Sequence, residues 1–124
     1  MARNLTNARA AKAVEWAKRH FRLHSWVITM VYSDEMPDWA DGLEKSHNGH
    51  LGSCQMRCDD ASADVWVSPL ACDRAGRDSL TVLMHEMAHV FLIARGHDTD
   101  DEFSADRIGE LAAFAYTHGM KPWR

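Results

Sequence analysis

The spacing of hydrophobic and polar positions divides the chain into helices and strands. In residues 5–22, apolar side chains recur at steps of three and four, which predicts an amphipathic helix that packs on a sheet or on another helix. Residues 25–32 are rich in β-branched and aromatic side chains, so they predict a strand buried on at least one face. Residues 34–48 follow no period, and we expect them either to wrap the surface or to form a short helix around Trp39 to Leu43.

A β-hairpin is predicted in the middle of the chain. Residues 50–58 alternate between two faces, and the side chains of one face are small, soft and mostly apolar. This inner face consists of Gly52, Cys54, Met56 and Cys58. After a turn at residues 59–62, residues 63–68 supply an antiparallel partner strand, which Pro69 ends.

Two further helices are predicted toward the C-terminus. The first has Asp78 or Ser79 as its N-cap, ends at Arg95 and Gly96, and is apolar nearly all round, so it should be buried. The second opens with acidic residues, which favour the positive end of a helix dipole, and runs to about His118. These elements predict one α+β domain over residues 1–124: an N-terminal helix, a small sheet with an antiparallel edge hairpin, and two C-terminal helices.

The buried helix carries the sequence His85-Glu86-Met87-Ala88-His89. Residues four apart on a helix share a face, so the imidazoles of His85 and His89 can converge on one tetrahedral metal ion. The Glu86 side chain is rotated away from that face, so it does not reach the metal itself. It can reach a water bound to the metal and act as a general base. Two imidazoles and a carboxylate are costly to bury without a partner, which favours a metal site over ordinary hydrogen-bonded histidines.

A catalytic zinc ion needs a third protein ligand, and the sequence offers two candidates. If Glu102 is the ligand, Asp106 stands one turn further along the last helix and can accept a proton from a ligating histidine. The same glutamate also fits a capping box with Thr99, in which it would only satisfy a backbone N–H. The rival ligand is His97, on the connection after Gly96. Small residues on the Glu102 face, Gly109 and Ala113, would let the two helices pack closely.

The motif together with residues 102–108 (Glu-Phe-Ser-Ala-Asp-Arg-Ile) resembles the gluzincin metallopeptidases, whose pattern is H-E-x-x-H with a downstream E-x-x-A-D or E-x-x-x-D. The similarity is closest to the minigluzincins and the ImmA/IrrE-type proteases, and it covers the last forty or so residues. The resemblance implies a compact zincin-like metallopeptidase domain, Glu102 as third zinc ligand and Asp106 as a supporting residue. The segment Gly96-His97 is similar to the SprT-like proteases, whose third ligand is a histidine in that place, which keeps His97 as the alternative.

This reading implies a zinc-dependent peptidase with one Zn²⁺ per chain and a protein or peptide as substrate. Glu86 would take a proton from the zinc-activated water and pass it to the leaving amine. A further donor should stabilise the developing oxyanion, and the candidates by proximity in sequence are Tyr116, His118, His97 and Arg107. One strand of the hairpin is expected to border the site and to receive substrate as an added strand. No feature of the sequence encodes a cleavage preference.

Composition limits the other functions that the chain can have. A formal net charge of −4 argues against a dedicated nucleic-acid binder. The SprT-like alternative would be associated with nucleic acid, and its only support is a basic N-terminal helix with Arg3, Arg9, Lys12, Lys18, Arg19 and Arg22. No secretion signal and no apolar run of about 20 residues is visible, so a soluble cytoplasmic protein without membrane contact is expected. The oligomeric state is not encoded in any visible pattern.

The three cysteines and two further histidines are candidate ligands of a second metal site. Cys54, Cys58 and Cys72 are an odd number, which suits reduced thiols, and with His47 and His50 they could bind a structural metal. Their spacing is not that of a C-x-x-C knuckle, and strand alternation already explains Cys54 and Cys58 as core residues. A last alternative is an interaction protein that uses the zinc at the motif only as a structural staple. The intact Glu86 argues against it, because a structural site needs no base.

Overall fold

The structure, a computed structural model, describes residues 4–43, 51–97 and 101–121. Arg3, His47, His50 and Thr99, which the sequence analysis singles out, lie outside these ranges. The elements in chain order are α1 (Asn7–His20), β1 (Val27–Tyr32), the 3₁₀ helix η1 (Asp38–Leu43), β2 (Gly52–Arg57), β3 (Ser62–Val67), α2 (Pro69–Arg74), α3 (Ser79–Ala94) and α4 (Glu102–Thr117). The predicted mixture of helices and a small sheet is confirmed.

The sheet has β3 in its centre, with the strand order β1-β3-β2. β2 and β3 form the predicted antiparallel hairpin, with Gly52 opposite Val67. β1 pairs with β3 in parallel, with Val27 opposite Ser62. A parallel pair needs a crossover connection, and here the chain passes through η1 and β2 between its two members. In the order β1-β3-β2, β2 lies at an edge of the sheet, whereas β3 is hydrogen-bonded on both sides.

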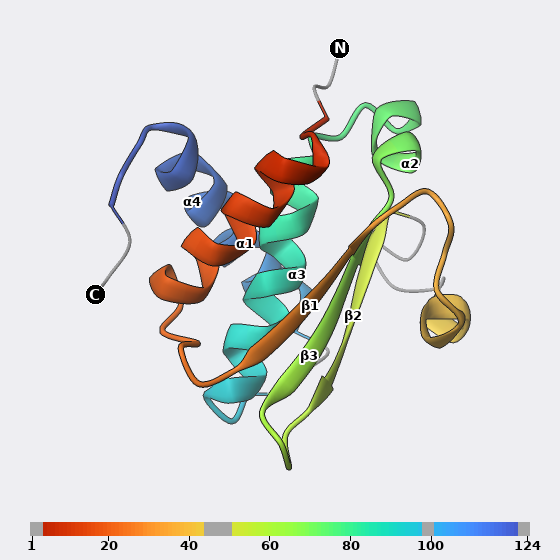
Figure 1. The fold of residues 1–124 in the computed structure, drawn as a ribbon. Helices are drawn as coiled ribbons and strands as arrows, with labels where there is room; N and C mark the ends of the chain where they lie inside the picture. The colour runs from red at the N-terminus through yellow and green to blue at the C-terminus, as the bar shows by residue number, and fades with distance from the viewer. Residues whose placement is uncertain (1–3, 44–50, 98–100, 122–124) are drawn as a thin grey trace.

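The helices α1, α3 and α4 lie on one side of the sheet (Figure 1). α3 packs on β2 and β3, α1 packs on β1 and α3, and α4 packs against α3 and α1. The core between these layers consists of aliphatic and methionine side chains, among them Val65, Val67, Val82, Leu83 and Met87, each fully buried. α3 is thus enclosed by the sheet and two helices, which explains why its sequence is apolar nearly all round.

The start of α3 is held by both its own cap and the N-terminal segment. Asp78 is the N-cap, and its side chain accepts a hydrogen bond from the Leu80 N–H. Ser79 is fully buried, and its Oγ lies 3.0 Å from the Leu5 backbone nitrogen and 3.0 Å from the Tyr32 hydroxyl. Tyr32 also donates to the Leu5 carbonyl at 2.8 Å. These bonds fix the axial position of α3 relative to β1.

Some local details differ from the sequence expectations. The helix α2 is not among the predicted elements, although Ser68 caps it and Pro69 occupies its first turn. Cys58 is exposed rather than part of the core, because β2 ends at Arg57 and the alternation does not continue beyond that residue. Cys72 is buried. None of the helices in the described ranges is long and apolar enough to cross a membrane.

Candidate metal centre

The middle of α3 brings three polar side chains into the interior. His85, Glu86 and His89 are 1%, 3% and 5% exposed, whereas their neighbours Met84, Met87 and Ala88 are fully buried apolar residues. Polar groups buried to this extent are stable only when they have partners, because each loses its contacts with water. The partners must come from α4, the sheet or a ligand.

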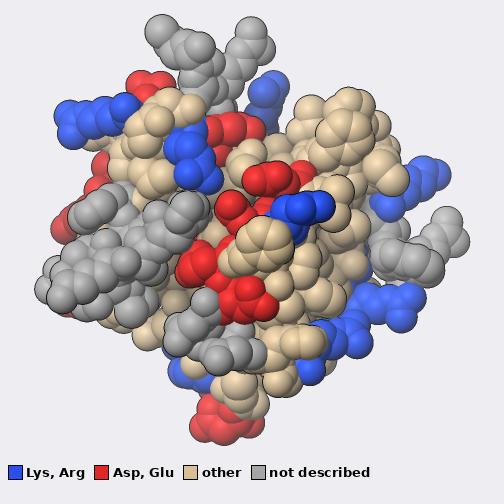
Figure 2. All heavy atoms as spheres, turned by 180° about the vertical axis from the view of Figure 1, so that it is seen from behind, with Lys and Arg blue, Asp and Glu red and all other residues tan. Residues whose placement is uncertain are grey.

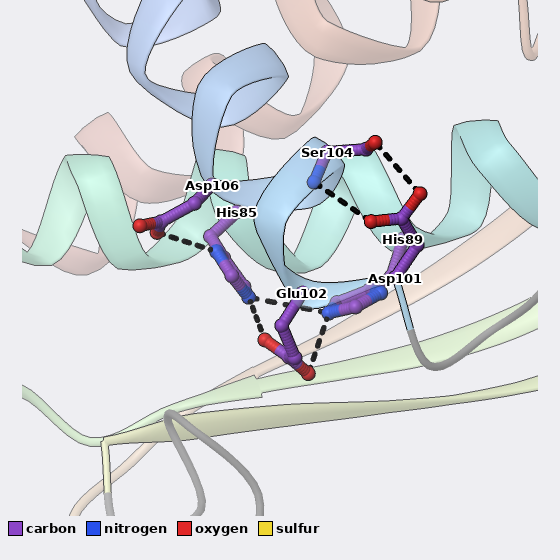
Figure 3. Close-up of polar contacts among 6 residues, drawn as sticks. All are labelled: His85, His89, Asp101, Glu102, Ser104 and Asp106. Atoms are coloured by element: carbon purple, nitrogen blue, oxygen red, sulfur yellow. Dashed lines mark hydrogen bonds and ion pairs between the residues drawn. The ribbon is translucent and has the colours of Figure 1, made fainter.

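The two imidazoles point at the carboxylate of Glu102, at the first position of α4 (Figure 3). His85 Nε2 lies 2.9 Å from Glu102 Oε2, and His89 Nε2 lies 3.1 Å from Glu102 Oε1. The two Nε2 atoms are 3.2 Å apart. Ligand atoms about 2.0 Å from a tetrahedral zinc ion would be separated by roughly 3.3 Å, so these three groups have the spacing of a zinc ligand set. His85, His89 and Glu102 could together hold a metal ion.

Asp106 contacts the other nitrogen of His85, with 3.1 Å between Oδ1 and Nδ1 (Figure 3). A carboxylate at Nδ1 favours the tautomer in which Nδ1 carries the proton, so Nε2 presents its lone pair to the cluster. That lone pair then faces the Glu102 oxygen, and two acceptors at 2.9 Å repel each other unless a positive charge lies between them. One cation at the centre would interact favourably with both imidazoles and the carboxylate.

The position of α4 depends on a close approach of two helix backbones at Gly109. A Cβ atom at this residue would lie 2.7 Å from His85 Cα and 2.8 Å from His85 N. Ala105, Ala112 and Ala113 are also buried on α4. These small side chains let α4 pack against α3 at the level of the motif, as expected from the sequence. The short separation brings Glu102 and Asp106, one turn apart, within reach of His85.

Glu102 does not occupy the capping-box position that the sequence also allowed. The N-cap of α4 is Asp101, whose side chain accepts hydrogen bonds from the Ser104 N–H and hydroxyl at 3.0 and 2.7 Å. These bonds, and more weakly the nearby His97 and His89, lower the pKa of Asp101 below its ordinary value. Because Asp101 performs the capping, the Glu102 carboxylate is left to face the histidines.

The remaining predicted site residues are placed as follows. His97 is exposed on the connection after α3 and does not belong to the cluster found among the described residues. Arg107 is exposed in the first half of α4. Tyr116 packs edge-on against Trp16, and His118 stacks on Phe114. Fourteen or more residues of helix separate the last two from Glu102, about 20 Å at 1.5 Å per residue, so they are too distant to donate to an oxyanion there.

Two residues of β2 lie beside Glu86. A hairpin strand was expected to border the site, but neither residue was named as part of it. A Cβ at Gly52 would lie 3.5 Å from Glu86 Cγ and 3.0 Å from Val82 Cγ1. Cys54 follows on the same face, and after burial the Glu86 carboxylate is the main cause of the raised pKa of its thiol. Strand alternation did place both residues on an inner face. It did not show that this face meets α3 at Glu86.

Acidic side chains also mark the outer surface near the site. Figure 2 shows Asp and Glu gathered around the middle of the face seen from behind. The N-cap and the helix α4 supply four carboxylates that are partly buried or exposed: Asp101, Glu102, Asp106 and Glu110. Negative charge of this density favours a bound cation.

Comparisons with known proteins leave the family open. No family model, no curated protein and no solved structure matches this chain.

The third ligand can be identified by metal titration of single variants. Glu102→Ala should weaken Zn²⁺ binding far more than His97→Ala, because the Glu102 oxygens lie beside both imidazoles. Asp106→Ala should weaken it about 10- to 100-fold, since loss of a group that orients a ligating histidine has that typical cost. Competition with a chromophoric chelator measures all three affinities. An affinity loss in His97→Ala as large as that in Glu102→Ala would identify the histidine as a ligand instead.

Proposed function

We propose that the protein is a zinc-dependent peptidase, with His85, His89 and Glu102 as the zinc ligands and Glu86 as the general base. The observation that carries this proposal is a set of three protein donors with a buried glutamate next to one of them in sequence. Structural zinc sites usually have four protein ligands, whereas catalytic sites have three and leave the fourth position to water or substrate. A zinc site that only stabilises the fold does not need Glu86 as a base.

Zinc, when bound, would supply a water of lowered pKa, near 7, and would polarise the substrate carbonyl. Glu86 would accept the proton of that water and later donate it to the leaving amine, so that one carboxylate acts as base and then as acid. Asp106 would keep the His85 imidazole in the tautomer with a proton on Nδ1. Arg107 and His97 remain the candidates for a donor to the oxyanion, because both lie in segments that adjoin Glu102.

The proposed substrate is an extended peptide that binds along the edge strand β2. β2 is an edge strand that packs on α3, and a Cβ at Gly52 in it would lie 3.5 Å from Glu86 Cγ. η1 packs against β2, but among the described residues no backbone hydrogen bond joins the two. An extended peptide could therefore pair with β2 through its backbone, with its scissile bond beside the metal. β3 cannot serve in this way, because it is paired on both sides.

The proposal is tested by metal analysis together with peptide cleavage. We expect about one zinc ion per purified chain, cleavage of members of a diverse peptide library detected by mass spectrometry, loss of cleavage on chelation, and its return on addition of Zn²⁺. His85→Ala is the control and should lose both metal and cleavage. Cleavage that persists in the chelated protein, or wild-type protein that does not bind zinc, would exclude the proposal.

A further inference from the structure

Cys54 approaches Glu86 from the sheet, in the edge strand β2. Side chains two residues apart on a strand point to the same face, so Cys54 shares the face of Gly52. That face lies against α3, because a Cβ at Gly52 would be 3.5 Å from Glu86 Cγ. Cys54 is partly buried and packs against the core residues beneath α3. Cys54 therefore lies on the strand face beside Glu86, whose carboxylate contributes to the raised pKa of its thiol.

The thiol is placed to donate a hydrogen bond rather than to bind the metal. The cluster of potential ligands in the described residues contains His85, His89 and Glu102 but not Cys54. Burial, and then the charge and hydrogen bond of Glu86, raise the pKa of the Cys54 thiol well above its ordinary value. The sulfur therefore keeps its proton at neutral pH. As the proposed general base, Glu86 is ionised, and an ionised carboxylate only accepts hydrogen bonds, so Sγ–H would be the donor and Glu86 the acceptor.

A general base on a flexible side chain needs such a contact. Glutamate has rotatable bonds between its backbone and its carboxylate, and Glu86 projects from α3 into the region between helix and sheet. Gly52 leaves room for the methylene groups of Glu86, and a larger residue there would contact both Glu86 and Val82. A donor at Cys54 then selects one orientation of the carboxylate among those that the space allows.

We propose that Cys54 is a positioning residue for Glu86: its Sγ–H binds one carboxylate oxygen and so directs the other toward the metal cluster. This inference rests on the proposed function, in which Glu86 is the general base. It goes beyond that function by assigning a role to a residue of the sheet, outside the motif and the two ligand helices. The thiol remains chemically unchanged throughout the reaction.

Two substitutions separate this role from simple packing. Cys54→Ser keeps a donor of similar size, whereas Cys54→Ala keeps an apolar Cβ and removes the donor. If the thiol only fills space, serine should be the worse replacement, because it introduces a hydroxyl among apolar neighbours. If the thiol positions Glu86, alanine should lower kcat about tenfold, in line with the loss of a weak hydrogen bond to a charged group, and serine should restore most of it. KM and zinc content should stay unchanged in both.

A spectroscopic measurement tests the contact without relying on turnover. The S–H stretching band of Cys54 is assigned in the infrared spectrum of the zinc-loaded protein as the band that Cys54→Ala removes. In Glu86→Gln this band should move to higher frequency, because an amide oxygen is a weaker acceptor than a carboxylate. Cys58→Ala is the matched control, since Cys58 is exposed, and should leave both the Cys54 band and kcat unchanged.

The infrared band and the kcat of the two Cys54 variants together test the positioning role. A shifted band together with serine rescue supports the positioning role. A band that does not move in Glu86→Gln overturns it, and so does a kcat in Cys54→Ser below that of Cys54→Ala. If the wild type binds zinc but cleaves no peptide, the proposed function fails, and the infrared comparison alone decides whether Cys54 donates to Glu86.

Discussion

Glu86→Gln should bind zinc like the wild type and hydrolyse peptides about 10²–10⁴ times more slowly, because it lacks a group that can accept the proton of the attacking water. The substitution preserves the size of the side chain and one acceptor oxygen, so the buried position, 3% exposed, should remain filled and the fold intact. Elemental analysis measures the zinc content, and the rate is followed on a peptide that the wild type cleaves.

Glu110→Gln is the matched control for this experiment. It makes the same chemical change at an exposed position of α4 and should leave both the zinc content and the rate unchanged. A Glu86→Gln protein that cleaves as fast as the wild type would contradict the assigned base. If that variant also performs equally in the cell, the zinc would be a structural staple in an interaction protein.

Gly109→Ala should lower both the stability of the fold and its affinity for zinc. The added methyl group would meet His85 Cα at 2.7 Å and His85 N at 2.8 Å, and these are backbone atoms that cannot rotate away. α4 must therefore move outward and carry Glu102 and Asp106 with it. We expect a loss of about 1–3 kcal/mol in the free energy of unfolding from overpacking, and a loss of about 10- to 100-fold in zinc affinity. Urea denaturation and chelator competition measure the two effects.

Gly119→Ala distinguishes a steric effect from a general effect of replacing glycine. Gly119 has a φ of +69° just beyond the end of α4, and a Cβ there would meet no atom within 4 Å. Alanine in this conformation should cost about 1 kcal/mol of stability through backbone strain alone. Its zinc affinity should equal that of the wild type, because the helix contact at His85 is untouched. If Gly109→Ala binds zinc as tightly as Gly119→Ala, the role given to Gly109 is refuted.

The local elements could be predicted from the sequence because their signals lie within a few residues. Asp78 as N-cap and Gly96 as the stop define α3, and the four-residue step between His85 and His89 places both on one face. The sequence of α2 also contains a usable signal, since Ser68 followed by Pro69 is a typical helix start. It was missed because the helix is short and directly follows a strand.

Other features depend on contacts between distant segments, for which the sequence has no local signal. The parallel pairing of β1 with β3 joins residues more than thirty positions apart, and nothing within either strand specifies it. The positions of Gly52 and Cys54 relative to Glu86 also depend on such a contact. The alternation in the sequence predicts that both lie on the inner face of a strand, but it does not specify which helix covers that face. Cys58 was misplaced for a local reason, because the period of two was extended past the end of β2. The third ligand was left open between Glu102 and His97, since either lies close to the motif in the chain.

The potential metal ligands all come from α3 and the first turn of α4, whereas Gly52 and Cys54 belong to a strand much earlier in the chain. Short loops close at a smaller entropic cost than long ones, so during folding the two-helix unit can form before the sheet docks on it. Metal bound at that stage would favour the folded state by mass action, without yet supporting chemistry. Docking of β2 then places Gly52 and Cys54 beside Glu86. In this order of assembly the protein would bind the ion first and would become active only when β2 has docked.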